Sequence, residues 1–380
     1  WLPIDPRKDK PPIDKCPYCG STKLIPETDV MDTWMDSSIT AAVHAGWPDN
    51  FDERLFPADL QPNGYDIIRT WDYYLLVRGL ILFDKPQFKT ALINGMVRGT
   101  DGRMMHKSYG NYVSLHEVLD KYGADAFRLW VALAVKTGSD LRFNWEGLEY
   151  ARRFLTKLWN AARLTWLFIK DYDPNIKPKE LRDVDHWILK HLNDTIDKAT
   201  AAMEEFDFQT ASTTLVDFIW RTLCDHYLEA IKWRLNVKEE LVKTQYVLHE
   251  IWKKILIMLS VFTPHIADEI YHTLLKEKPW KSITIAPWPT KIDVDEEKAQ
   301  RGDVVIKVIA ALRRAKHEIN IPLNVTISKA TIYTREYADV IKANIDDIKG
   351  TIRITELEVA EGKGKYTVSE YPEITFDLTP

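Results

Sequence analysis

The residues best suited to chemistry form the segment Gly102-Arg103-Met104-Met105-His106-Lys107-Ser108-Tyr109-Gly110-Asn111, here called the lysine loop, just after a predicted strand. Glycines bound the loop, and Lys107 and Ser108 bring an ammonium group and a hydroxyl. A mobile loop of this kind can close over a triphosphate and neutralise the charge that develops on a leaving pyrophosphate. The loop is not a Walker loop, and the alternative interpretation is an exposed polar turn.

A second set of residues is suited to holding a small apolar group. Ile67 and Trp71 are four positions apart, so they share one face if their segment is helical. Trp34, from a separate segment, would complete an apolar box around a branched side chain. The alternative is that all three are ordinary core residues.

Two cysteines have the spacing of a zinc knuckle, Cys16-Pro-Tyr-Cys19-Gly20. Zinc usually takes four ligands, and the only other cysteine, Cys224, lies in a predicted helix. We therefore expect at most half of a zinc site, formed by Cys16 and Cys19.

Composition places these residues in a large globular protein. The 380 residues exceed the roughly 250–300 at which a single core stops growing, so we expect more than one packed unit. The content of 45% hydrophobic and 28% charged residues excludes disorder, and three cysteines favour a reducing, cytoplasmic location over a disulfide scaffold. The net charge is −5, so a nucleic-acid surface would have to be a local patch. No apolar run approaches the ~20 residues of a membrane helix.

Four regions are predicted along the chain. Residues 1–28 form a connecting segment with the knuckle. Residues 29–145 include a strand over 88–97 and a helix over 113–134 broken at Tyr122-Gly123, which indicates half of an α/β sheet. Residues 146–290 carry apolar residues at helical spacing and predict a helical bundle. Residues 291–380 predict a small α+β domain with strands over 325–333, 352–359 and 374–378.

The lysine loop and its flanks resemble the KMSKS region of class I aminoacyl-tRNA synthetases. Met104-Met105-His106-Lys107-Ser108 occupies the motif, between Asn94-Gly-Met-Val97-Arg98 and Lys121-Tyr-Gly-Ala-Asp-Ala-Phe-Arg128. The resemblance implies that Lys107 and Ser108 brace the phosphates of ATP during adenylate formation, and that Val97 and His106 belong to the ATP site. Met104 replaces the first lysine of the motif and His106 its middle serine, so Arg103 or His106 would supply part of the missing charge.

Two further stretches, residues 29–38 and Gly64-Tyr-Asp66-Ile67-Ile-Arg-Thr-Trp71, resemble the valyl subfamily of these enzymes. The resemblance implies that Trp34, Ile67 and Trp71 form the amino-acid pocket and that Gly64 and Asp66 lie at the ribose of ATP. A carboxylate is a suitable acceptor for ribose hydroxyls. An isoleucyl or leucyl relative is the nearest alternative, and a stand-alone tRNA-binding module without catalysis is an alternative of another class.

For the whole chain, the resemblance implies the second half of a Rossmann-like catalytic domain, an anticodon-binding bundle and a terminal α+β domain. Its implied substrates are valine, ATP with Mg²⁺, and tRNA(Val), and no membrane is involved. Candidate tRNA contacts on the bundle are Arg221, Lys232, Trp233 and Arg234, although any one of them fits an ordinary solvated helix face. The His-x-Gly-His motif and the editing insertion have no counterpart in this sequence. We therefore expect a C-terminal fragment that does not form adenylate alone.

Overall fold

The computed structural model describes residues 5, 8–30, 32–275 and 278–379. Parts of the predicted knuckle segment and residue 31 of the stretch 29–38 lie outside the described residues. The chain divides into two compact units, residues 1–96 and 97–380, and each is described by itself. The predicted boundaries after residues 28, 145 and 290 stay predictions. Within the described ranges no helix has both the length and the apolar character needed to cross a bilayer.

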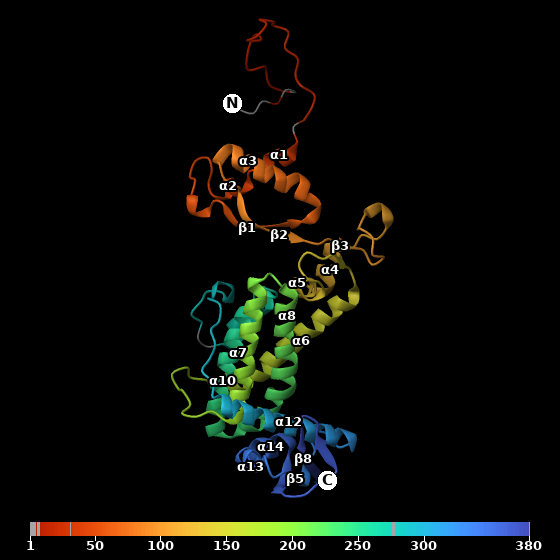
Figure 1. Ribbon diagram of the computed structural model, residues 1–380, viewed down its shortest axis with the longest axis vertical. Helices are drawn as coiled ribbons and strands as arrows, with labels where there is room; N and C mark the ends of the chain where they lie inside the picture. The colour runs from red at the N-terminus through yellow and green to blue at the C-terminus, as the bar shows by residue number, and fades with distance from the viewer. Residues whose placement is uncertain (1–4, 6–7, 31, 276–277, 380) are drawn as a thin grey trace. The chain divides into compact units, whose positions relative to one another are not determined.

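A parallel pair of strands frames the first unit (Figure 1). Strands β1 (Ala58–Gly64) and β2 (Phe88–Asn94) pair in parallel, and helix α3 (Tyr73–Phe83) connects them. A strand, a helix and a parallel strand form the repeating unit of α/β sheets. The remaining elements are α1 (Thr33–Ser37), α2 (Thr40–His44), the 3₁₀ helices η1 (Glu53–Leu55) and η2 (Tyr65–Ile67), and the π-helical η3 (Ile68–Asp72).

Helix α3 leaves part of its apolar surface uncovered in this unit. The side chains of Leu80, Ile81 and Leu82 are 55%, 75% and 46% exposed. Exposed apolar side chains that lie next to one another can mark a contact with another part or partner.

The second unit opens with the elements around the lysine loop. Strand β3 (Val97–Arg98) pairs in parallel with β4 (Leu141–Arg142). Between them lie the 3₁₀ helix η4 (Lys107–Tyr109) and the helices α4 (Leu115–Tyr122) and α5 (Ala124–Ala134). The predicted helix break is confirmed: Gly123 separates α4 from α5 with a φ of 81°, a conformation that favours glycine.

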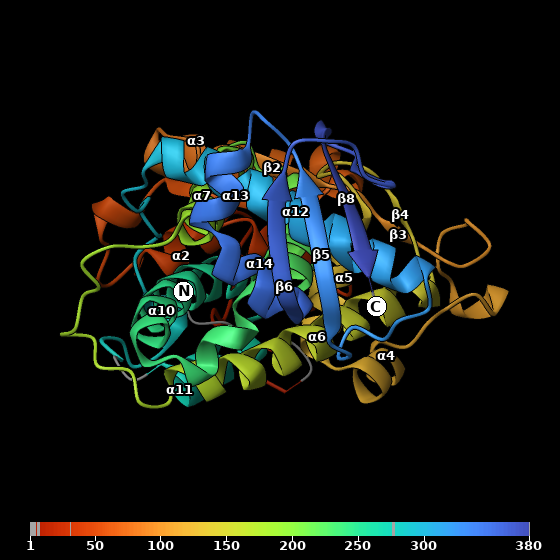
Figure 2. The ribbon, with the colours of Figure 1, turned by 90° about the horizontal axis from the view of Figure 1, so that it is seen from below.

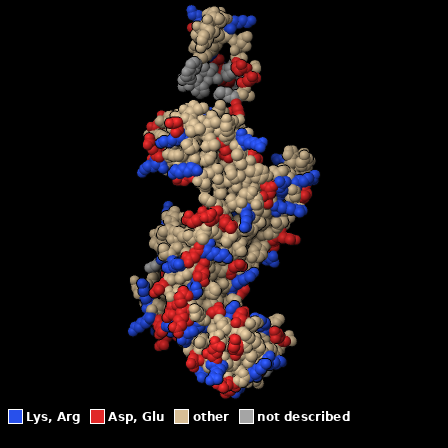
Figure 3. All heavy atoms as spheres, in the orientation of Figure 1, with Lys and Arg blue, Asp and Glu red and all other residues tan. Residues whose placement is uncertain are grey.

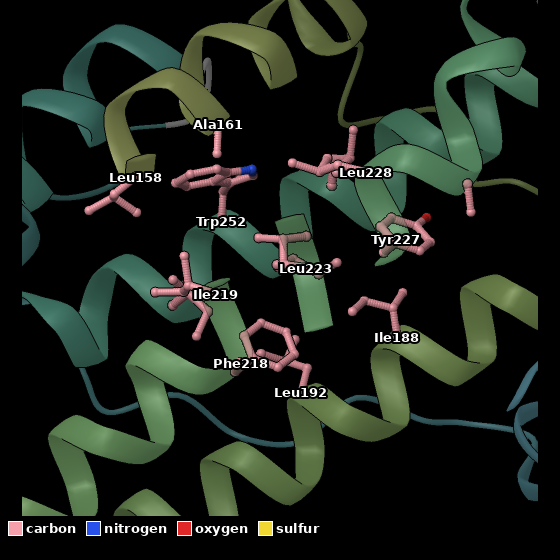
Figure 4. Close-up of a cluster of buried hydrophobic side chains, with 14 of the residues drawn as sticks. Leu158, Ala161, Ile188, Leu192, Phe218, Ile219, Leu223, Tyr227, Leu228 and Trp252 are labelled. Atoms are coloured by element: carbon pink, nitrogen blue, oxygen red, sulfur yellow. The ribbon is translucent and has the colours of Figure 1, made fainter. Parts of the chain in front are cut away.

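Long helices follow and form the predicted bundle. Figure 4 shows side chains of its core, among them Leu158, Ile188, Leu223 and Trp252, pointing toward one another from different helices. The side chain of Trp166, by contrast, is 45% exposed. The elements are α6 (Trp145–Ile169), α7 (Asp183–Glu204), α8 (Phe208–Asp217), the π-helical η5 (Phe218–Tyr227), α9 (Leu228–Ile231), the 3₁₀ helix η6 (Lys232–Asn236), α10 (Lys238–Leu259), α11 (Pro264–Leu274) and the 3₁₀ helix η7 (Ile283–Ile285).

The end of the chain combines helices with a four-stranded sheet of order β6-β5-β8-β7. Strands β5 and β6 are parallel, and β8 runs antiparallel to β5 and β7. Figure 2 shows β6, β5 and β8 side by side in front of α12. The three predicted strands are observed, and the short β7 was not predicted. The elements are α12 (Glu296–Glu318), β5 (Ile327–Tyr333), α13 (Ala338–Ala343), α14 (Ile345–Ile352), β6 (Ile354–Ala360), β7 (Tyr366–Val368) and β8 (Tyr371–Thr379).

A buried charge network joins this terminal region to the bundle. The Arg234 guanidinium lies 2.8 Å from a carboxylate oxygen of Asp185 and 2.8 Å from one of Asp347, and all three side chains are fully buried. The Tyr227 hydroxyl donates to Asp185 at 2.8 Å. Burial opposes the charge of Arg234, but the two carboxylates outweigh it and raise the pKa of Arg234. The suggestion that Arg234 contacts tRNA is therefore wrong, because its side chain is enclosed and already paired.

Candidate active-site residues

The proposed ribose-binding residues lie where β1 ends. Gly64 is paired with Asn94 of β2, at the carboxyl edge of the parallel strands, which is where ligands bind in α/β sheets. A Cβ atom on Gly64 would lie 2.6 Å from Oδ1 of Asp66 and 3.2 Å from the sulfur of Met96. Glycine therefore leaves the space that the Asp66 carboxylate occupies. Asp66 is exposed, so its oxygens are open to a ligand's hydroxyl groups.

A buried hydrogen bond fixes the turn that carries these residues. Nδ2 of Asn63 donates to Oδ2 of Asp72 at 2.9 Å and to the carbonyl oxygen of Gly64 at 3.1 Å. Burial raises the pKa of Asp72. The bond ties the end of β1 to the segment before α3, across residues 64–71. Sequence reasoning missed Asn63 and Asp72, although polar residues bracketing the matched stretch were a usable signal.

The two tryptophans of the predicted amino-acid pocket come from elements that are bonded to each other. Nε1 of Trp71, in η3, donates to Oγ of Ser37 at 3.0 Å, and that hydroxyl donates to the carbonyl oxygen of Trp34 in α1 at 3.1 Å. Trp34 is 38% exposed, and Trp71 and Ile67 are half-buried. The predicted helix is a 3₁₀ turn that ends at Ile67, followed by a π-helical turn that holds Trp71. These side chains are thus partly accessible, unlike the fully buried residues of a core.

The lysine loop is folded back on itself at the end of β3. Arg98 and Met104 form an antiparallel bridge, and the Gly99 N–H donates to the carbonyl oxygen of Arg103 at 2.8 Å. Val97, at the start of β3, is 40% exposed. The structure therefore brings Val97 and the loop into one local arrangement, within the second unit. Within the first unit, Gly64 lies against Asp66, and Trp71 is linked through Ser37 to the backbone of Trp34.

The loop presents Lys107 without a carboxylate partner. Lys107 is exposed, its ammonium lies 5.6 Å from the ring centre of Tyr112, and it makes no ion pair with a carboxylate of the described ranges. The Nδ1 atom of His106 lies 2.7 Å from Oγ of Ser108. The nearby Asp101 is engaged elsewhere: the N–H of Arg103 and the amide of Asn111 lower its pKa to about 2. Lys107 is therefore available to an anion.

The cysteine pair forms a tight turn. The Gly20 N–H donates to the carbonyl oxygen of Cys16 at 2.9 Å, and the backbone N–H groups of Cys19 and Tyr18 lower the pKa of the Cys16 thiol. In the part of the chain that the structure describes, no group of three or more His, Cys, Asp or Glu side chains is arranged to hold a metal ion. Zinc binding by Cys16 and Cys19 is therefore not supported.

Comparison with known families defines the class of the protein. Residues 7–144 match the family described as tRNA synthetases class I (I, L, M and V), and residues 185–332 match the anticodon-binding domain of tRNA ligase. The chain therefore belongs to the class I aminoacyl-tRNA synthetases.

Individual relatives are more specific than the class. The valine–tRNA ligase of Pyrococcus horikoshii is 41% identical over 95% of this chain, and that of Methanothermobacter thermautotrophicus is 41% identical over 96%. The chain covers 42% and 41% of the length of these two proteins, so it spans about two fifths of its curated relatives. A solved structure of the LeuRS of Agrobacterium radiobacter K84 in a LeuRS-tRNA-LeuAMS complex shares the fold, with a TM-score of 0.59, 24% identity, and coverage of 75% of this chain and 35% of that one.

Proposed function

We propose that this chain is part of a valine–tRNA ligase that activates valine with ATP and transfers it to tRNA(Val). In the first step a carboxylate oxygen of valine attacks the α-phosphorus of ATP, and the bond from that phosphorus to pyrophosphate breaks. In the second step a terminal ribose hydroxyl of tRNA attacks the valyl carbonyl, and AMP leaves. The identity of 41% to valine–tRNA ligases over 95% of the chain carries this proposal.

The lysine loop would stabilise the charge that leaves with pyrophosphate. The Lys107 ammonium would approach the departing phosphate oxygens, with the Ser108 hydroxyl as a second donor and His106 and Val97 beside the nucleotide. Fixed donors aimed at developing charge lower the barrier, because they need no reorganisation during the reaction. The exposure of Lys107 and its lack of a carboxylate partner in the described ranges support this role.

The first unit would hold the ribose and the amino acid. Asp66 would accept from the ribose hydroxyls, and Gly64 would give its carboxylate the necessary space. Trp34, Ile67 and Trp71 would enclose the valine side chain. The partial exposure of Trp34 and the bonded chain from Trp71 through Ser37 to α1 support a pocket rather than a core.

The parallel pair β1–β2 would be part of a larger Rossmann-like sheet. A two-stranded sheet is marginal alone, α3 exposes apolar side chains, and the relatives are more than twice as long as this chain. On this proposal the present residues hold one half of the catalytic site and do not form adenylate alone.

Mg²⁺ accompanies ATP in the proposed reaction. The described part of the chain offers no cluster of three metal-ligating side chains. Mg²⁺ in nucleotide sites is usually held by phosphate oxygens, water and one or two carboxylates, and we assign no step to it.

The bundle would bind tRNA, and the reaction would take place in the cytoplasm. The match of residues 185–332 to an anticodon-binding domain supports this role. On the face shown in Figure 3, acidic and basic side chains are interspersed over the second unit. On this face, an RNA contact would therefore be a local set of residues rather than a uniformly basic surface.

The test is amino-acid-dependent exchange of pyrophosphate into ATP by the complete gene product. We expect exchange with valine and much less with isoleucine or leucine. Preference for isoleucine or leucine would favour the nearest alternative. Binding of tRNA without exchange for any amino acid would favour a binding module.

A further inference from the structure

We propose that Asn111 is a positioning residue that holds the lysine loop in the conformation from which Lys107 meets the leaving phosphates. The inference rests on the proposed function and assigns a role to a residue that stands outside the predicted site. In the proposed role, Asn111 contacts neither the substrate nor the reacting atoms. It acts through the backbone on which Lys107 is carried.

The side chain of Asn111 bonds to three residues, two in the lysine loop and one, Asp101, just before it. Its Nδ2 donates to Oδ1 of Asp101 at 3.1 Å and to the carbonyl oxygen of Met104 at 3.0 Å. Its Oδ1 accepts from the N–H of His106 at 2.9 Å. The Asn111 amide therefore donates two hydrogen bonds and accepts one, all with residues 101–106.

These bonds reach from the start of the loop to the residue next to Lys107. Asp101 in turn accepts from the backbone N–H of Arg103 at 3.0 Å and from its Nε at 2.8 Å. The Asp101 carboxylate and the backbone at residues 103, 104 and 106 are thus tied into one network centred on Asn111. Since His106 immediately precedes Lys107, the amide fixes where the lysine leaves the backbone.

Gly99 leaves room for this arrangement. A Cβ atom at Gly99 would lie 3.0 Å from Nδ2 of Asn111 and 3.0 Å from Oδ1 of Asp101. Such distances are shorter than ordinary van der Waals contacts, so any larger residue would push the amide and the carboxylate. The main chain before the loop is therefore shaped around the bonded pair.

Only an amide fits all three contacts. Aspartate at position 111 would keep the acceptor for the His106 N–H, but it would place a second carboxylate against Asp101 and the Met104 carbonyl. Alanine would remove every bond. Since displacing a charge-stabilising group by about 1 Å can cost up to 10²-fold in rate, loss of these bonds should be visible in catalysis.

The experiment uses the complete enzyme with Asn111→Ala, Asn111→Asp and the exchanged pair Asp101→Asn/Asn111→Asp. We expect Asn111→Ala and Asn111→Asp to lower kcat/KM for ATP in valine-dependent exchange by roughly tenfold. The KM for valine and the Tm should stay unchanged. The exchanged pair should recover part of the loss from Asn111→Asp, because Nδ2 of the new Asn can again donate to the partner carboxylate.

The matched control is Asn175→Ala. The side chain of Asn175 likewise donates to an aspartate, Asp173, but this pair lies in the turn before α7. The Asn175→Ala variant should leave valine-dependent pyrophosphate exchange unchanged. Unchanged kcat/KM for ATP in Asn111→Ala would overturn the proposal, as would a rise in the KM for valine that parallels the loss.

Amide hydrogen exchange of peptides covering residues 104–109 separates this proposal from the proposed function. Asn111→Ala should speed exchange there, because the His106 N–H loses its acceptor. If wild-type enzyme shows no valine-dependent pyrophosphate exchange, the proposed function fails. Hydrogen exchange would still measure whether Asn111 fixes the loop. Unchanged hydrogen exchange would show that Asn111 does not fix the loop.

Discussion

At the scale of single residues, the site depends on which charges are already satisfied. Asp101 and Arg103 are bonded to each other and to the loop backbone, whereas Lys107 has no carboxylate partner among the described residues. The sequence motif identified Lys107 as a candidate because it is a cation in a loop bounded by glycines. It did not identify Asn111, because the role of that residue depends on contacts that the spacing of residues does not reveal. Arg234 was misassigned for the same reason, because burial and partners are properties of the fold.

Replacing the loop cation tests the proposed catalytic role directly. Lys107→Ala in the complete enzyme should slow valyl-adenylate formation at least tenfold, since one donor aimed at the developing charge is lost. Lys107→Arg should retain more of the rate because it keeps the charge. Single-turnover adenylate formation measures the effect, with the exposed Lys136→Ala as the control. A rate equal to wild type would exclude this loop from stabilising the transition state.

At the scale of elements, glycine and proline mark some ends of the helices. Gly123 ends α4, and Pro264 begins α11, as glycine and proline do in general. The π-helical segment η5 was not predicted, because Leu215, Ile219 and Leu223 keep a four-residue spacing that also fits an α-helix. Strand β7 was missed because three residues carry too little pattern.

The crossing of α12 and α7 depends on one glycine. A Cβ atom at Gly302 would lie 2.3 Å from the carbonyl oxygen of Asp183 and 2.8 Å from Cβ of Trp187. Gly302→Ala should therefore lower the free energy of unfolding by about 1–3 kcal/mol, the usual cost of overpacking, even though alanine favours a helix. Urea unfolding measures this, and exposed Gln300→Ala on the same helix should be neutral. A stabilised Gly302→Ala would mean that the helices separate easily.

At the scale of the whole molecule, polar contacts as well as apolar ones join the terminal sheet region to the bundle within the second unit. Asp185 comes from α7, Arg234 from η6 and Asp347 from α14. Gly350, also on α14, lies so close to Trp233 that a Cβ atom there would be 2.4 Å from the indole. The helical bundle and the small sheet were each predictable from periodicity, but this connection was not, because its residues are 49 and 113 positions apart.

Breaking the network should destabilise the second unit. Arg234→Met leaves Asp185 buried without its cation and leaves Asp347 with only Arg182, at 3.0 Å. Removing the cation from a buried pair typically costs about 3–5 kcal/mol. Arg221→Met is the matched control, because Arg221 is 76% exposed and pairs with Asp217 at the surface, where an ion pair contributes about 0–1 kcal/mol. Urea unfolding measures the free energy of unfolding of both variants, and Arg234→Met should lose more than Arg221→Met. Equal losses would contradict the network's role.

The resting position of the Lys107 ammonium, over the ring of Tyr112, has a consequence for how the loop would work. An exposed cation over an aromatic ring gains only about 0.5–1 kcal/mol. Such a weak contact breaks readily when a polyanion binds, whereas a lysine paired with an acidic side chain would first have to lose its ion pair. The uncharged ring of Tyr112 thus holds the ammonium within the loop without competing with the phosphates for it.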